Sequence, residues 1–144
     1  YIQESGLGEW VMVHDAARPC VRVEEIVELL SAIEGSEVGG LLASPVENTL
    51  KRAVCSDAGA NRSESTETVD RSTLWYAYTP QIFRYGLLKK ALLAAAEAGT
   101  AVTDEASAIE MLGYKPLLLE SSRDNIKITQ PSDLKLAENI LLSQ

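Results

Sequence analysis

Several polar side chains of this chain are placed where they could bind a ligand. In an open sheet of strands and helices, ligands bind beyond the carboxyl ends of the strands, so polar residues that follow predicted strands or open predicted helices are the first candidates. A lysine inside an apolar run is a further candidate, because lysine is rarely buried without a partner. These residues are Asp15, Arg18, Thr79, Thr103, Asp104 and Lys127.

Asp15 and Arg18 lie three residues apart, directly after the apolar run 10–14. A phosphate ligand that carries a divalent ion needs an oxygen ligand for the metal and a fork-shaped donor for the phosphate, and these two side chains could supply both. The alternative is a turn aspartate paired with a surface arginine. The two residue types alone favour that alternative.

Thr103 and Lys127 also have two interpretations each. Thr103 can cap a helix predicted from Asp104 to about Leu112, or it can contact a ligand at the start of that helix. Lys127 lies in the strand-like run 125–129, where a functional and a structural role are equally supported by the residue types.

The remaining reactive residues do not form a catalytic triad or a zinc site. The chain has one histidine, His14, which we interpret as a structural residue beside the loop that contains Asp15. Cys20 and Cys55 are too few for a disulfide framework, lack metal-ligand spacing and have no evident catalytic partner. A reducing cytoplasm is therefore the expected compartment.

Composition narrows the class of protein further. The chain has 144 residues and 46% hydrophobic content, which predicts one compact unit. Its net charge of -8 provides no electrostatic footprint for nucleic acid, so an anionic ligand must be small. No apolar run approaches the roughly 18 to 20 residues of a membrane span. Residues 1–8 have neither a basic start nor an apolar run, so we expect a soluble fragment or processed product without a secretory signal.

Alternating strand and helix patterns must position the candidate residues, and they predict an α/β sheet with helices on both faces. Strands are predicted at 10–14, 39–46, 74–79, 115–120 and 125–129, with Pro80 ending the third. Helices are predicted at 23–33, 87–98 and 104–112, and after Pro131.

The segment 47–70 differs from the rest of the chain. Half-polar strand candidates flank the loop CSDAGANRSES, which is poor in apolar residues and rich in turn formers. We interpret this segment as an excursion from the core. Lys51, Arg52 and Arg71 are expected to be solvated charges unless an anionic ligand or a second subunit approaches them.

Six short motifs occur in one order and together resemble the 2-C-methyl-D-erythritol 4-phosphate cytidylyltransferase family. They are HDAARP at 14–19, TVDR at 68–71, LW at 74–75, TPQ at 79–81, TDEAS at 103–107 and NIKIT at 125–129. Each motif alone is weak, but their number, order and spacing make the match specific. The resemblance implies a Rossmann-like nucleotidyltransferase fold of which residues 1–144 are the C-terminal portion, and a homodimer in which a projecting β-arm at about 47–70 reaches the partner's active site.

The resemblance also implies roles for individual residues. Asp15 and Lys127 would be catalytic, and Asp15 would bind Mg²⁺ or another divalent cation, or the sugar-alcohol moiety. The other residues would bind the acceptor substrate, methylerythritol phosphate, with those of the arm acting across the dimer. These substrate-binding residues are Arg18, Thr49, Arg71, Thr79, Thr103 and Asp104.

The implied reaction is attack by the phosphate of methylerythritol phosphate on the α-phosphorus of CTP. It would give 4-diphosphocytidyl-2-C-methyl-D-erythritol and pyrophosphate, in the non-mevalonate route to isoprenoids. Such a displacement needs positioning and charge neutralisation more than a protein nucleophile. The implied location is a bacterial cytoplasm or a plastid stroma.

The chain departs from the family pattern before Trp10, where nothing resembles the family's glycine-rich loop for the CTP triphosphate. We therefore expect this chain to be inactive alone, with most of the acceptor site and little of the CTP site. The alternatives are a ribitol 5-phosphate cytidylyltransferase, a non-catalytic dimerisation fragment, and a sugar-nucleotide transferase for another base.

Overall fold

The computed structural model describes residues 9–54 and 63–144. The chain divides into two compact units, whereas its length and composition predict one. The first unit is formed by Tyr1–Ser44 with Ala77–Gln144 and the second by Pro45–Tyr76. The second unit contains the predicted excursion at 47–70. No helix in the described ranges is long and apolar enough to cross a membrane.

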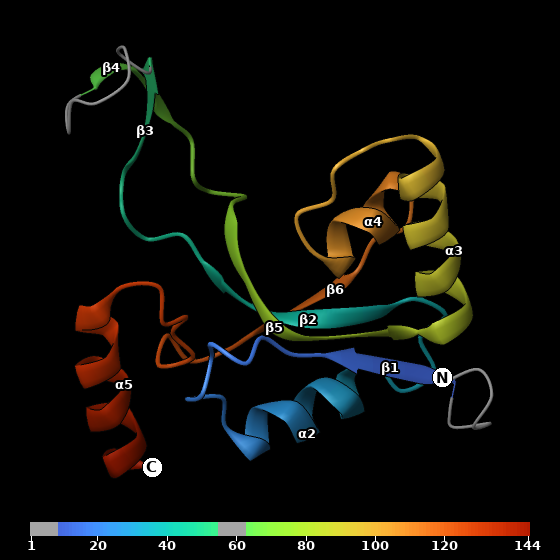
Figure 1. Cartoon of the computed structure of the whole chain (residues 1–144), viewed down its shortest axis with the longest axis horizontal. Helices are drawn as coiled ribbons and strands as arrows, with labels where there is room; N and C mark the ends of the chain where they lie inside the picture. The colour runs from blue at the N-terminus through green and yellow to red at the C-terminus, as the bar shows by residue number, and fades with distance from the viewer. Residues whose placement is uncertain (1–8, 55–62) are drawn as a thin grey trace. The chain divides into compact units, whose positions relative to one another are not determined.

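A four-stranded mixed sheet forms the centre of the first unit, with strand order β1-β5-β2-β6 (Figure 1). β1 (Trp10–Val13) runs antiparallel to β5 (Trp75–Arg84), and β2 (Gly39–Pro45) runs parallel to β6 (Leu117–Glu120). Val13 at the end of β1 lies opposite Gln81. The loop that follows β1 is therefore brought beside the middle of β5.

Helices cover both faces of this sheet, as the sequence pattern predicts. Alternate residues of a strand point to opposite faces. Leu41 and Phe83 accordingly pack in one cluster with residues of α3 (Tyr85–Glu97) and α4 (Glu105–Met111). Their neighbours Leu42 and Ile82 pack in the other cluster with Leu29 of α2 (Val23–Ala32) and with Ile33, which directly follows that helix. The last helix, α5 (Pro131–Ser143), begins at its proline, where a missing N–H costs no helical hydrogen bond.

Two strand predictions are wrong. Pro80 does not end β5, which continues to Arg84, because the pairing with β1 begins only at Gln81 and needs no N–H from the proline. The run 125–129 forms no regular strand. Its main chain runs beside a loop instead, where the N–H of Ile128 donates to the carbonyl of Ala17 at 2.8 Å.

The predicted cap of α4 is also corrected. The helix is capped by Asp104, whose Oδ1 accepts from the N–H of Ser107 at 2.8 Å. Thr103 lies one residue earlier, and its N–H donates to the Ser107 hydroxyl at 3.1 Å. Asp104 has the cap position because its backbone is extended there, which brings its carboxylate over the first turn.

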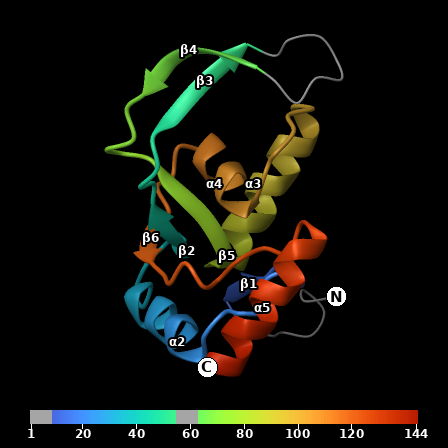
Figure 2. The ribbon, with the colours of Figure 1, turned by 90° about the vertical axis from the view of Figure 1, so that its left-hand side faces the viewer.

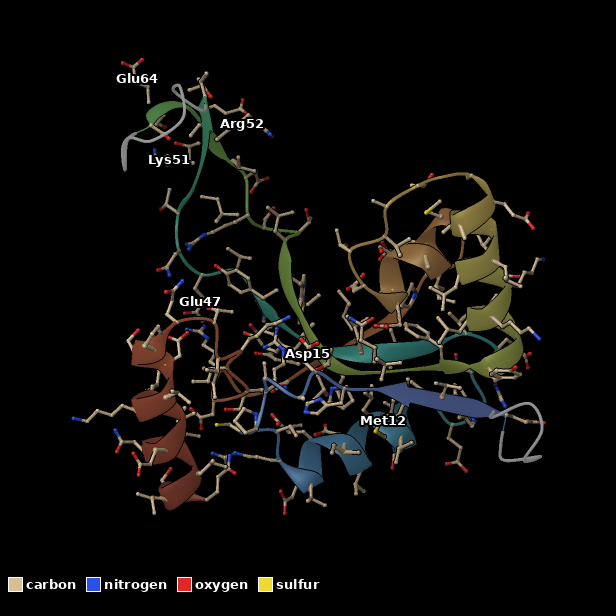
Figure 3. All side chains as sticks on the ribbon, viewed as in Figure 1. Met12, Asp15, Glu47, Lys51, Arg52 and Glu64 are labelled. Carbon is tan, nitrogen blue, oxygen red and sulfur yellow. The ribbon has the colours of Figure 1, made fainter. Side chains whose placement is uncertain are left out.

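The second unit contains a two-stranded antiparallel sheet of β3 (Leu50–Val54) and β4 (Glu64–Val69) (Figure 2). Arg52 pairs with Glu67, and Lys51 Nζ donates to the Thr68 hydroxyl at 2.6 Å. The side chains of Lys51 and Arg52, which are labelled in Figure 3, are exposed as expected. Most of the predicted loop between the strands lies outside the described residues.

Candidate active site

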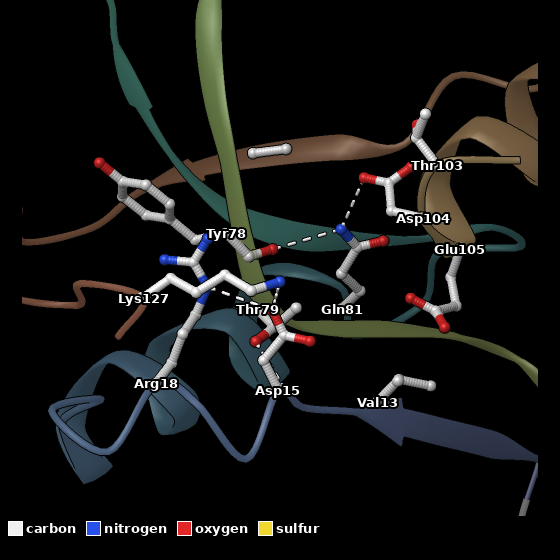
Figure 4. A pocket seen from close by; sticks show the side chains of 11 residues that line it. Val13, Asp15, Arg18, Tyr78, Thr79, Gln81, Thr103, Asp104, Glu105 and Lys127 are labelled. Atoms are coloured by element: carbon white, nitrogen blue, oxygen red, sulfur yellow. Dashed lines mark hydrogen bonds and ion pairs between the residues drawn. The ribbon is translucent and has the colours of Figure 1, made fainter. Parts of the chain in front are cut away.

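A cavity of about 390 Å³ lies beyond the carboxyl end of β1 (Figure 4). Figure 3 places Met12 on β1 and Asp15 just past its end. The cavity is lined by residues from the β1 loop, β5, the start of α4 and the segment before α5. They are Val13, Asp15, Arg18, Ala77, Tyr78, Thr79, Gln81, Thr103, Asp104, Glu105 and Lys127.

Asp15 lies between two cations. Its Oδ2 is 2.8 Å from Lys127 Nζ and 3.6 Å from Arg18 Nε. The hydrogen bond from Lys127 is the main cause that holds the pKa of the Asp15 carboxyl below its ordinary value, and the charge of Arg18 acts in the same direction. Asp15 is therefore an ionised carboxylate at neutral pH, with 37% of its side chain exposed.

Arg18 is buried, so its interpretation as a surface arginine is wrong. Its Nη1 donates to the carbonyl of Asn125 at 2.7 Å, and its guanidinium lies 4.9 Å from the ring centroid of Tyr78. Burial lowers the pKa of Arg18, but a guanidinium remains protonated in proteins. These contacts hold a fixed positive charge at the cavity wall.

Lys127 is exposed rather than enclosed in an apolar strand. Because the run 125–129 is not part of the sheet, its lysine extends along the cavity to Asp15 (Figure 4). Lys127 is therefore a candidate because it lines the cavity and not because it is buried.

Thr79 ties the β1 loop to β5 from the middle of that strand, not from its carboxyl end as predicted. Its hydroxyl oxygen accepts from the N–H of Asp15 at 3.0 Å and lies 2.9 Å from His14 Nδ1. His14 Nε2 lies 3.0 Å from the carbonyl of Arg18, so Nε2 donates. In the neutral ring Nδ1 is then the acceptor of the Thr79 proton. His14 is thus a structural residue of the loop, as expected.

Thr103 and Asp104 bring the start of α4 to the same cavity. Asp104 Oδ2 accepts from Gln81 Nε2 at 2.9 Å, and Gln81 Oε1 accepts from the N–H of Ala106 at 2.8 Å. Gln81 is 1% exposed. The strand and the helix are therefore joined through one buried carboxamide.

The structure brings together the six candidates of the first unit and does not place the other two with them. Thr49 and Arg71 are exposed residues of the unit Pro45–Tyr76. Arg71 precedes a turn in which the N–H of Leu74 donates to its carbonyl at 3.0 Å. Their predicted roles in substrate binding remain predictions.

Sequence reasoning missed three residues that shape the site. Gln81 and Tyr78 line the cavity, and Asn125 Nδ2 donates to the carbonyl of Thr79 at 2.9 Å. Gln81 had a visible signal, because it is a lone polar residue before the apolar pair Ile82 and Phe83. Asn125 stands in the motif NIKIT, but its role in the site comes from contacts with residues distant in sequence.

Comparisons with known proteins identify the family of the chain. The family model described as 2-C-methyl-D-erythritol 4-phosphate cytidylyltransferase matches residues 2–143. A protein of that name from Aliivibrio fischeri (strain MJ11) is 50% identical over 139 residues, which are 96% of this chain and 56% of the relative. One from Serratia proteamaculans (strain 568) is 52% identical over 136 residues, covering 94% of this chain and 56% of the relative. The chain thus spans little more than half the length of these relatives.

Solved structures show the same fold. A crystal structure of 4-diphosphocytidyl-2C-methyl-D-erythritol synthase has a TM-score of 0.80 and 41% identity, covering 97% of this chain and 62% of that protein. The 2-C-methyl-D-erythritol 4-phosphate cytidylyltransferase from Thermus thermophilus has a TM-score of 0.79 and 32% identity, covering 95% of this chain and 64% of that one. Both the Rossmann-like nucleotidyltransferase fold and the resemblance of the six motifs are confirmed. This chain belongs to the 2-C-methyl-D-erythritol 4-phosphate cytidylyltransferase family.

Proposed function

We propose that the whole protein to which this chain belongs transfers a cytidylyl group from CTP to 2-C-methyl-D-erythritol 4-phosphate. The products would be 4-diphosphocytidyl-2-C-methyl-D-erythritol and pyrophosphate, in the non-mevalonate route to isoprenoids. The observation that carries this proposal, together with the family, is the ionised Asp15 beside Lys127 and Arg18 in one cavity. Ribitol 5-phosphate and another base are not favoured, because the matching family and relatives are named both for methylerythritol phosphate and for cytidylyl transfer.

The arrangement of charges suits this displacement. A phosphate oxygen of the acceptor forms a bond to the α-phosphorus of CTP, and the bond from that phosphorus to the bridging oxygen breaks, so that pyrophosphate leaves with the electron pair. The reaction needs positioned cations and no protein nucleophile. Lys127 and Arg18 would neutralise and orient the acceptor phosphate. Asp15 would hold Lys127 in place through their 2.8 Å contact.

Asp15 also fits a role in binding Mg²⁺. Its carboxylate is ionised, partly exposed and faces the cavity. The described residues contain no group of three or more His, Cys, Asp or Glu side chains that could hold a metal, so Asp15 would act as a ligand without a complete protein cage. Mg²⁺ is often held by one or two carboxylates together with substrate phosphates. When bound, the ion would neutralise phosphate charge.

We further propose that the protein is a homodimer through the arm at 47–70, with Thr49 and Arg71 acting at the partner's site. The support is the exposure of β3 and β4, because an isolated two-stranded sheet is marginally stable and gains from additional packing. We also propose a bacterial cytoplasm rather than a plastid stroma as the location, because these relatives are bacterial proteins.

The test is an assay of the whole protein with CTP, Mg²⁺ and methylerythritol phosphate. Phosphorus NMR should show a new diphosphate diester and an equal amount of pyrophosphate. Ribitol 5-phosphate in place of the acceptor, and UTP in place of CTP, are the parallel reactions. Diester formation from ribitol 5-phosphate but not from methylerythritol phosphate would contradict the proposed acceptor.

The dimer needs a separate measurement. Sedimentation of the whole protein should give twice the mass of one chain, and a mixture of Arg71→Ala and Lys127→Met subunits should have more activity than either variant has alone. A monomer that is fully active would refute the arm proposal.

A further inference from the structure

Both polar atoms of the Gln81 side chain are hydrogen-bonded to other protein groups, although the residue lines the cavity. Its Nε2 donates to Asp104 Oδ2 at 2.9 Å and to the carbonyl of Tyr78 at 3.3 Å, while its Oε1 accepts from the N–H of Ala106 at 2.8 Å. The side chain is 1% exposed. A glutamine is rarely buried so completely unless its contacts hold other groups in place.

Asp104 retains acceptor capacity toward the cavity. Its Oδ1 accepts from the N–H of Ser107 and its Oδ2 from Gln81. An ionised carboxylate offers about four acceptor positions, so two contacts leave room for a ligand donor. Asp104 is half-buried and lines the cavity. Gln81 and Ser107 fix both oxygens, so the direction of the remaining acceptor positions is set by these partners.

The charges of the cavity are separated. Figure 4 shows Arg18, Lys127 and Asp15 gathered on one side, and Thr103, Asp104 and Glu105 on the other, with Gln81 between the groups. A phosphate is attracted by the two cations, whose combined charge exceeds that of the single Asp15 carboxylate beside them, and it is repelled by the carboxylates of Asp104 and Glu105 at the start of α4. A hydroxyl group can donate to a carboxylate, which a fully ionised phosphate cannot do.

We propose that Gln81 is a positioning residue that holds Asp104 to accept a hydroxyl hydrogen from the polyol part of the acceptor. The acceptor would then bind with its phosphate at Arg18 and Lys127 and its hydroxyls toward α4. This inference rests on the proposed function and adds the residue that positions Asp104.

The test is the variant Gln81→Glu in the whole protein. The new carboxylate keeps the acceptor for Ala106 but loses the donor to Asp104 and to the carbonyl of Tyr78. Two facing carboxylates cannot both ionise without repulsion, so one retains a proton to a higher pH than an isolated carboxyl. Below that pH the protonated pair restores the contact, and above it Asp104 is displaced. The other charged groups around the cavity, Asp15, Arg18, Glu105 and Lys127, are unchanged.

The expected result is a KM for methylerythritol phosphate that rises about tenfold or more with pH in Gln81→Glu, as for loss of one hydrogen bond to a charged group. The KM of the parent protein should not show this additional rise. Gln130→Glu is the matched control, because it makes the same change at the exposed N-terminus of α5 and outside the cavity. Its KM should follow that of the parent.

A double variant separates positioning from folding. In Gln81→Glu with Asp104→Asn, the asparagine amide can donate to the new carboxylate, so the midpoint of thermal unfolding should return toward that of the parent. The pH dependence of KM should disappear, while KM stays high because the acceptor carboxylate is lost. If Gln81→Glu loses stability and its KM does not vary with pH, Gln81 is merely structural and the inference is overturned. If the parent protein makes no product from methylerythritol phosphate, the proposed function fails and the inference falls with it.

Discussion

Replacing Lys127 with methionine removes the ammonium group 2.8 Å from Asp15 and keeps an unbranched apolar side chain. Both partners are partly exposed, at 48% for Lys127 and 37% for Asp15. Solvent therefore screens the pair, and the variant should lose no more than about 1 kcal/mol of unfolding free energy. A phosphate ligand that loses one charge-assisted hydrogen bond should bind about 1.5 to 3 kcal/mol more weakly. Affinity should thus fall by about tenfold to a hundredfold while the fold is nearly unchanged.

The pH dependence of stability provides a second measurement on the same variant. Lys127 is the main cause that lowers the pKa of Asp15 from its ordinary value of 3.8. A lowered carboxyl pKa stabilises the folded chain above the unfolded pKa, and this stabilisation is lost as the pH falls through the folded value. The parent should therefore have a larger unfolding free energy than Lys127→Met at neutral pH. This difference should disappear as the pH falls below 3.8.

Calorimetric titration of methylerythritol phosphate into the parent and into Lys127→Met measures the affinity of each for this ligand. Urea unfolding of both at neutral and acid pH measures their stability. Lys90→Met is the control, because it removes an exposed lysine of α3 that lies outside the cavity. An affinity of Lys127→Met within about twofold of the parent, or an equal loss in Lys90→Met, would refute the reasoning.

Three further predictions follow from single contacts. Gly39→Ala should prevent folding or cost more than about 3 kcal/mol of unfolding free energy, since φ is +124° and a Cβ would lie 2.8 Å from the Cα of Phe83; circular dichroism and urea unfolding check this. Tyr78→Phe should cost about 1 to 3 kcal/mol because it leaves Ser44, 2% exposed, without its 2.7 Å partner, whereas adding Ser44→Ala should recover part of the loss in a double-mutant cycle. Cys20 should react with a thiol reagent far more slowly in the native chain than in denaturant, because burial raises its pKa; equal rates would contradict this, and the measurement uses a Cys55→Ser background.

Much of the fold could be predicted because its signals are local. The helix patterns at 23–33 and 87–98 and the strand patterns at 10–14 and 39–46 correspond to α2, α3, β1 and β2. Each depends on periodicity and on start and end residues that neighbours in sequence provide. The layered arrangement followed from the same patterns.

The errors arose where distant partners decide the outcome. Pro80 is tolerated in β5 because of where the pairing with β1 begins, and 125–129 lies outside the sheet because its main chain meets the β1 loop at Ala17. The cap of α4 depends on one-residue differences in backbone geometry at Asp104. None of these can be derived from residue type alone.

The sequence by itself determined the family, the α/β class and six residues of the candidate site, because each depends on residue identity and local spacing. Only the tertiary structure decided that Arg18 is buried, that Lys127 reaches Asp15 and that Gln81 holds Asp104. Charge pairs and buried hydrogen bonds join atoms that are dozens of residues apart in the chain. Their geometry is created only when the sheet sets the β1 loop beside β5 and helix α4 against the same strand.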